Sequence, residues 1–375
     1  MSSKSQDEET YSPIQFLKSS RLVEEQLKLT PEYVIHKFQN ERKFVQIMLD
    51  NCSIQCMEHM YIKVDGEGRN ANEQDVYDFG LGPLLQLLKV PFVALSATGL
   101  VEMPGSKVSK ALQSYLRFCD QFWPGHLDDP QASTSSRERC ESEQRVNFNE
   151  LPDDFRLANG VAYVPFMQYQ YIYRCLSHLS PEKKFEAYLF GMIHHMDIIS
   201  AFELEVMKYL FWDPKRSIQK FPQSVQKRKK LIKENFGKAG SKNIEQCRYI
   251  AFDRTMDSMW LKMSALADDF SKEAALADGV QVEIWLGTND IKLYELCQDI
   301  HSVKTHESSM GMLCVDREDE LKKDDYWRHV DALSQSVLLS RRRKGALDPE
   351  EQLPMIDKAL SQIEKELKAH FETKR

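Results

Sequence analysis

The chain has 375 residues, of which 42% are hydrophobic and 29% are charged, and its formal net charge is −7. This length is enough to bury a large core, in one elaborated domain or in two, and the composition is that of a globular protein, not of a disordered or fibrous one. The acidic balance excludes a global positive field, so any contact with nucleic acid depends on local basic patches.

Cysteine usage and hydropathy point to the compartment. The eight cysteines are scattered, with no C-x-x-C pair and no paired Cys/His spacing of the zinc type. We therefore expect free thiols in a reducing cytosol. The first residues hold no apolar stretch of signal-peptide length, and no segment approaches the ~18 uninterrupted apolar residues of a membrane span. These patterns predict a cytoplasmic protein that does not bind membranes.

The first part of the expected core lies near the N-terminus. Residues 1–43 have a polar start followed by helical spacing, which predicts a helical lead-in. Residues 44–103 hold two apolar strands: FVQIML, which ends at the polar break DNCS, and PFVALSAT, which follows the helical stretch FGLGPLLQLLKV. Compact apolar runs of this length are typical of buried strands. We expect the helix after the first strand to begin near Ile54.

The middle of the chain, residues 104–242, is expected to be a mainly helical insertion. Its polar segment near 124–150 is low in β-branched residues and predicts a disordered loop. From 163 to 212 the apolar residues recur at helical spacing and are dense in aromatics, which predicts two or three packed helices.

Residues 243–310 are expected to complete the core. A helix from about 243 to 266 leads to the strand VQVEIWLGTND, and residues 292–300 predict the helix after it. Residues 311–375 predict a helical C-terminal extension, in which Pro349 suits the first turn of the last helix. The order of strands and helices indicates an α/β fold.

Acidic residues lie at the ends of apolar runs, or in the helix starts that follow them. Carboxylates at the carboxyl edge of an open α/β sheet point into the crevice where such sheets bind ligands. Several of them would repel one another unless a hard divalent cation, Mg²⁺ or Mn²⁺, sat among them. The pattern indicates a divalent-metal site formed by Asp50, Glu102, Asp253 and Asp290.

The order of these acidic phrases resembles the PIN-domain nucleases. In chain order, the four phrases similar to those of the family are LDNCS at 49–53, SATGLVE at 96–102, the helical stretch 249–260, and LGTNDIKL at 286–293. The resemblance covers the pieces near 44–103 and 243–300. It implies a three-layer α/β/α PIN-like domain with a parallel sheet, interrupted by a large helical insertion and followed by a helical tail.

For such a site the resemblance implies metal-assisted hydrolysis of phosphodiester bonds. One or two Mg²⁺ or Mn²⁺ ions held by the four acids would polarise the phosphate and lower the pKa of a bound water. Thr288 and Asn289 would orient Asp290 or the phosphate, and Glu205 is a reserve ligand. The complete set of secondary positions is Asn51, Thr288, Asn289, Asp257 and Glu205.

Two basic runs are the places where phosphate contact is predicted, although such runs are also typical of solvated faces. RNA is favoured over DNA as the partner, and assembly into a homo-oligomer is left open. The predicted nucleic-acid contacts are Lys227, Arg228, Lys229 and Lys230 in the first run and Arg341, Arg342 and Arg343 in the second.

Several alternatives stay open at this stage. A structure-specific DNA nuclease fits the same acids. A catalytically inactive PIN-like binding or assembly module is motivated by Asn51-Cys52, which stands where the family usually has Thr/Ser-Asn, and by the long helical additions. A wholly helical protein is a third alternative, because short apolar runs are ambiguous between strand and buried helix. His194 and Asp197 share a helix face and are a rival metal site, although adjacent histidines are more often core residues.

Overall fold

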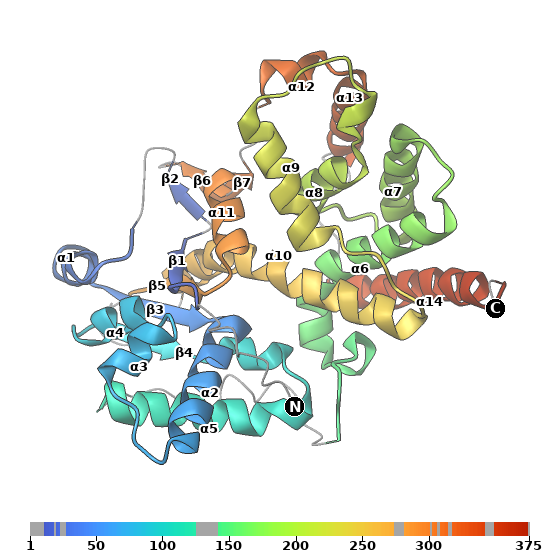
Figure 1. The fold of residues 1–375 in the computed structure, drawn as a ribbon. Coiled ribbons are helices and arrows are strands. Elements are labelled where there is room, and N and C mark those ends of the chain that lie inside the picture. The colour runs from blue at the N-terminus through green and yellow to red at the C-terminus, as the bar shows by residue number, and fades with distance from the viewer. Residues whose placement is uncertain are drawn as a thin grey trace. The chain divides into compact units, whose positions relative to one another are not determined.

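The computed structural model describes residues 11–18, 20–22, 28–124, 142–273, 281–300, 302–305, 308–313, 317–341 and 349–373 (Figure 1). The chain forms two compact units. Unit 1 consists of Met1–Gln144, Lys262–Cys297 and Ser302–Gly311, and unit 2 consists of Arg145–Leu261, Gln298–His301 and Met312–Arg375. Each unit is described by itself.

A four-stranded sheet forms the centre of unit 1, in the order β1-β5-β3-β4. Strand β3 pairs in parallel with β4 and β5, and β1 is antiparallel to β5. The sheet is therefore mostly parallel, which confirms the predicted α/β class and excludes the wholly helical alternative. The strands span Gln15–Leu17 (β1), Lys43–Leu49 (β3), Val93–Ser96 (β4) and Gln281–Thr288 (β5).

The central strand β3 is buried because it has neighbours on both sides and helices packed nearby. Val45, Ile47 and Leu49 have no measurable exposure, as expected for a parallel strand in the middle of a sheet. Helix α2 packs against α5 beside the sheet. The helical segments that begin in unit 1 are α1 (Pro31–Glu41), α2 (Asn51–Gly66), α3 (Glu73–Asp78), α4 (Gly82–Leu88), the 3-10 helix η1 (Thr98–Glu102), α5 (Gly105–Phe122) and α11 (Ile291–Asp299).

A second, three-stranded sheet was not predicted. Its order is β2-β6-β7, and β2 runs parallel to β6. The strands are only three to six residues long, so their apolar pattern is too short to distinguish them from loop. They span Ser20–Leu22 (β2), Ser302–Thr305 (β6) and Ser308–Leu313 (β7).

Helices with an aromatic core form unit 2. Residues 163–212 lie largely in three helices, as the spacing predicts, and the core includes Tyr163, Phe166, Tyr188 and Trp327, all at most 1% exposed. The helices are α6 (Asp153–Cys175), α7 (Pro181–His195), α8 (Ala201–Phe211), α9 (Gln223–Phe236), α12 (Asp319–Lys323), α13 (Asp325–Arg341) and α14 (Pro349–Thr373), with 3-10 turns η2 (Phe148–Glu150) and η3 (Pro214–Arg216). Helix α10 (Ile244–Glu273) contributes to both units.

The units cut across the predicted parts of the chain. Helix α14 of the predicted C-terminal extension packs along α6 of the predicted insertion. Gly160 makes this approach close, because a Cβ there would lie 2.4 Å from Ile356 Cδ1, and Arg248 Nε donates to Glu364 Oε1 at 2.8 Å. The insertion and the extension therefore share one core.

The predicted loop near 124–150 falls mostly outside the described residues, at 125–141. At its far end Phe148 is buried and stacks on Tyr163 with ring centroids 4.0 Å apart. This end of the predicted loop is therefore part of the core of unit 2. In the described ranges, every helix is too short or too polar to span a lipid bilayer.

Candidate functional site

The parallel register brings two of the predicted acids to one edge of the sheet. Leu49 of β3 lies opposite Gly287 of β5. The residues that follow these two positions therefore emerge together at the carboxyl edge. They are Asp50 after β3 and Thr288, Asn289 and Asp290 at the end of β5.

Asp50 is buried at this edge, with 4% of its surface exposed. Its Oδ1 accepts a hydrogen bond from the Ser53 N–H at 2.8 Å, so that it caps α2, and its Oδ2 accepts a short hydrogen bond from the Thr288 hydroxyl. Burial raises the pKa of Asp50 to about 6 and the nearby Asp290 charge adds to the rise, while the bonds from Thr288 and Ser53 oppose it.

Thr288 links the two acids. Its hydroxyl donates to Asp50 and accepts from the backbone N–H of Asp290 at 2.9 Å. Asp290 in turn caps α11, because its Oδ1 accepts from the N–H groups of Lys292 at 2.8 Å and Leu293 at 3.1 Å. The two carboxylates are thus held by caps at the starts of two helices.

Ser53 and Asn289 contact each other next to the two acids. Ser53 Oγ lies 2.8 Å from Asn289 Oδ1 and 3.1 Å from the Gly287 carbonyl, and the Asn289 amide donates to the Ser12 carbonyl at 2.7 Å. Sequence reasoning named Asn289 but missed Ser53. The available signal was its place three residues after Asp50, where a helix cap finds its N–H partner.

Glu102 and Asn51 belong to the same unit as this pair. Glu102 ends η1, the turn that follows β4, and is partly buried. Helix η1 abuts the start of α2, because a Cβ on Gly99 would lie 2.3 Å from the Asn51 nitrogen. Asn51 itself uses its side chain within α2, where Oδ1 accepts from Gln55 Nε2 at 2.7 Å.

The remaining predicted acids lie in unit 2 with arginine partners. On α10, Asp253 is 3.6 Å and Asp257 2.8 Å from nitrogens of Arg254. Glu205 is buried on α8 and accepts from Arg317 Nη2 at 2.7 Å. These contacts give each acid an ionic partner within its own unit.

No group of three or more His, Cys, Asp or Glu side chains that can hold a metal ion occurs in the part of the chain that the structure describes. The predicted quartet is therefore not such a group, and the rival residues His194 and Asp197 do not share a helix face as predicted, because α7 ends at His195. Asp50 and Asp290 remain as a pair of neighbouring carboxylates at the sheet edge.

The first basic run is divided by the helix that carries it. On α9, Arg228 is buried and donates to Asp299 Oδ1 at 3.0 Å, and Lys229 donates to the Trp212 carbonyl at 2.6 Å. These two side chains are engaged inside unit 2 and do not fit the predicted contact with phosphate. Lys227 and Lys230 are exposed.

The second basic run lies mostly outside the described residues. Arg341 is the last residue of α13, and Arg342 and Arg343 lie outside the described residues. The predicted nucleic-acid contact of this run therefore stays a prediction.

Comparison with known proteins assigns the chain to no family. No family model matches the chain, and no curated protein or solved structure matches it. The class of protein that fold and site define is an α/β protein with two neighbouring carboxylates, a buried Asp50 and a half-buried Asp290, at the carboxyl edge of a mostly parallel sheet.

Proposed function

We propose that this protein is a Mg²⁺- or Mn²⁺-dependent nuclease with a three-layer, PIN-like α/β/α domain, most suited to RNA, whose metal binds between Asp50 and Asp290. One observation supports the proposal above the others. Parallel pairing of β3 with β5 delivers both carboxylates to one edge of the sheet, and they are close enough for the charge of Asp290 to raise the pKa of Asp50.

The donor set fits a hard divalent cation. Mg²⁺ keeps several of its waters and binds through one or two carboxylates together with phosphate oxygens of a substrate, so two acids suffice. Asp50 Oδ1 accepts from the Ser53 N–H and Oδ2 from the Thr288 hydroxyl, and a carboxylate offers about four lone-pair sites in all. A cation between the acids would also remove the repulsion that disfavours the ionised form of Asp50.

The roles of the chain's own residues follow from their contacts. A bound divalent ion supplies an activated water and stabilises the leaving oxygen. Thr288 fixes the direction of Asp50 and the start of α11 through its two hydrogen bonds. Ser53 and Asn289 hold the turn after β5 against α2, so that the acids keep their separation while substrate enters.

Metal binding is the most direct test. Mn²⁺ should raise the melting temperature of the wild type by several degrees, because a ligand that binds only the folded state stabilises it. The variant D290N should lose this response and any cleavage of single-stranded RNA. The matched control D120N removes the same charge from an exposed position on α5 and should respond as the wild type does. An equal Mn²⁺ response of D290N and wild type would reject the proposal.

A second candidate function is a catalytically inactive PIN-like binding or assembly module. The specific observation in its favour is that Asp50 and Asp290 both act as helix caps, a role that needs no metal. Under this candidate Mn²⁺ leaves the melting temperature unchanged and RNA stays intact in wild type and D290N alike. Cleavage assays with RNA and with DNA of the same sequence distinguish a ribonuclease from a DNA nuclease.

A further inference from the structure

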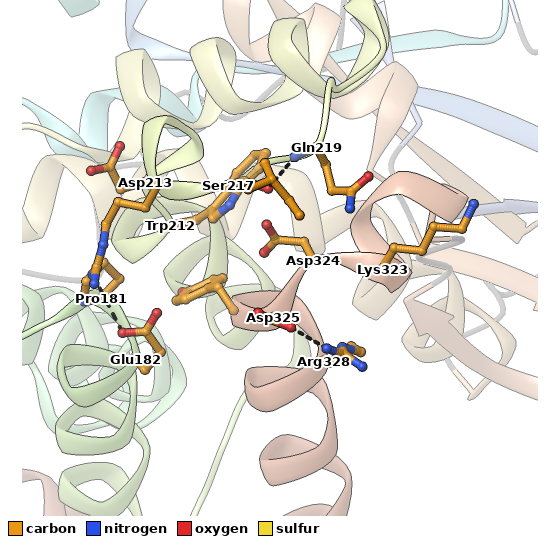
Figure 2. Close-up of a pocket in the computed structure, with 13 residues that line it drawn as sticks. Pro181, Glu182, Trp212, Asp213, Ser217, Gln219, Lys323, Asp324, Asp325 and Arg328 are labelled. Atoms are coloured by element: carbon orange, nitrogen blue, oxygen red, sulfur yellow. Dashed lines mark hydrogen bonds and ion pairs between the residues drawn. The ribbon is translucent and has the colours of Figure 1, made fainter.

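Unit 2 contains a cleft of about 430 Å³, within the size range of sites for small ligands. The carboxylate pair belongs to unit 1, so the two sites are made of different residues. The cleft lies at the N-termini of α7 and α13 and beside residues 212–219 (Figure 2). None of its lining residues takes part in the proposed nuclease chemistry.

Asp324 provides the charge that defines this cleft. It is 5% exposed and caps α13, because its Oδ1 accepts from the Trp327 N–H at 3.2 Å. No described residue donates to its Oδ2 or forms an ion pair with it. Figure 2 shows the carboxylate directed into the cleft. A carboxylate without a counter-ion attracts a cation that enters the cleft, so the site favours a cationic ligand.

The arginines of the cleft already have carboxylate partners. Arg216 Nη1 lies 3.7 Å from Glu182 Oε2, and Arg328 forms an ion pair with Asp325. Lys323 also lines the cleft, but Figure 2 shows its side chain directed away from Asp324. These cations therefore leave the negative charge of Asp324 uncompensated, and the cleft is poorly suited to an anion.

Aromatic rings complete the wall. Trp212 and Tyr326 line the cleft and are 3% and 5% exposed. Lys229 Nζ already lies over the Trp212 ring, 5.7 Å from its centroid, so the two rings serve the cleft as an apolar wall, which suits the carbon skeleton of an organic cation better than a strongly hydrated metal ion. The N-terminus of α13 opposes a cation with a partial charge of roughly +0.5, which is smaller than the full charge of Asp324. Ile218 is 96% exposed beside the cleft and offers apolar contact to a group attached to the cation.

We propose that this cleft binds an organic monocation, a guanidinium or alkylammonium group, with Asp324 as its counter-ion. A bare metal ion is a poorer occupant, since the cleft does not gather three metal-ligating side chains from the described residues. The inference does not depend on nuclease activity. Its test uses binding alone, so the failure of one proposal leaves the other standing.

Isothermal titration calorimetry of the full chain tests the inference with ethylguanidinium and n-butylammonium ions as probes. At least one probe should bind at one site per chain, and D324N should weaken it about tenfold or more, because the buried counter-ion is lost. Asn can still cap α13, so the variant should keep the melting temperature of the wild type to within a few degrees.

The matched control is D319N. This change removes the same charge from α12, at a side chain that is 78% exposed and does not line the cleft, and should alter affinity by less than about threefold. The inference is overturned if neither cation binds up to about 10 mM, if D324N and D319N bind equally well, or if inorganic phosphate binds in their place.

A further titration distinguishes the two sources of such a cation, an arginine side chain of another polypeptide and a small metabolite. Acetyl-Gly-Arg-Gly-amide carries the guanidinium on a peptide, and ethylguanidinium carries it alone. Tighter binding of the peptide, reduced by I218S, identifies an arginine side chain of another polypeptide as the ligand. Tighter binding of the free ion identifies a small metabolite.

Discussion

At Asp50, burial and hydrogen bonding oppose each other. Burial disfavours the charged carboxylate, whereas the Ser53 N–H and the Thr288 hydroxyl favour it, and the balance leaves the pKa raised from 3.8 to about 6. The folded protein therefore holds this proton more tightly than the unfolded chain does. The stability that protonation gives is fully present below the unfolded pKa and is lost as pH rises through about 6.

Stability as a function of pH tests this balance through D50N. Asn caps α2 as Asp does but carries no charge. The free energy of unfolding of the wild type should therefore fall relative to that of D50N by about 2 kcal/mol between pH 4 and pH 7. Urea unfolding of both proteins at several pH values measures this difference. Two curves that run parallel across the window would show that the Asp50 pKa is not raised.

At the scale of elements, Gly99 sets how closely η1 approaches α2. A Cβ at this position would lie 2.3 Å from the backbone nitrogen of Asn51 and 2.3 Å from the carbonyl carbon of Asp50. Backbone atoms at the start of a capped helix cannot move aside as a flexible side chain can. The turn after β4 can therefore lie beside the carboxylate pair only with glycine here.

Replacing Gly99 with alanine tests this packing. G99A should destabilise the fold by about 1–3 kcal/mol, the usual cost of overpacking, as measured by urea unfolding, and should weaken the Mn²⁺ response by displacing Asp50. The matched control is G66A, where an added Cβ meets nothing within 4 Å. Because alanine favours the helix, G66A should be neutral or stabilising by up to about 1 kcal/mol. Equal losses in the two variants would contradict a specific contact at Gly99.

The apolar runs predicted the positions of the main strands. The exact helix start after β3 and the short strand β1 were harder to predict from the sequence. Strands β3, β4 and β5 lie where the sequence predicts them, because each is a compact run rich in apolar residues. Helix α2 begins at Asn51 and not near Ile54, since Asp50 itself serves as the cap. The β1 strand of three residues is defined by its pairing with β5, which no local pattern reveals.

At the scale of the whole molecule, the sequence predicted which acids follow strands but not which of them meet. Asp50 and Asp290 meet because β3 and β5 are neighbours, although they are far apart in the sequence. Asp253 lies 3.6 Å from an arginine next to it in sequence, a contact that a motif comparison does not show. Sequence alone also could not tell that Arg228 faces inward, because charge runs carry no information on which side of a helix is buried.

The last prediction concerns where positive charge lies on the surface. A chain of net charge −7 can bind RNA only through local cations. On α9 the exposed lysines of the first run are Lys227 and Lys230. The double variant K227A/K230A should weaken binding of single-stranded RNA and reduce the slope of log K against log salt by about 1.4, at roughly 0.7 per lost phosphate contact. Fluorescence anisotropy at several salt concentrations measures both quantities.

The control for this charge change is K358A/K365A, which removes two exposed lysines from α14 and lowers the net charge by the same amount. If RNA contacts α9, the control should keep the wild-type slope and lose little affinity, because exposed charges more than about 10 Å from the ligand are screened at physiological salt. Equal effects of the two double variants would show that RNA responds to net charge and not to a face formed by Lys227 and Lys230. The RNA contact would then have to lie elsewhere on the molecule.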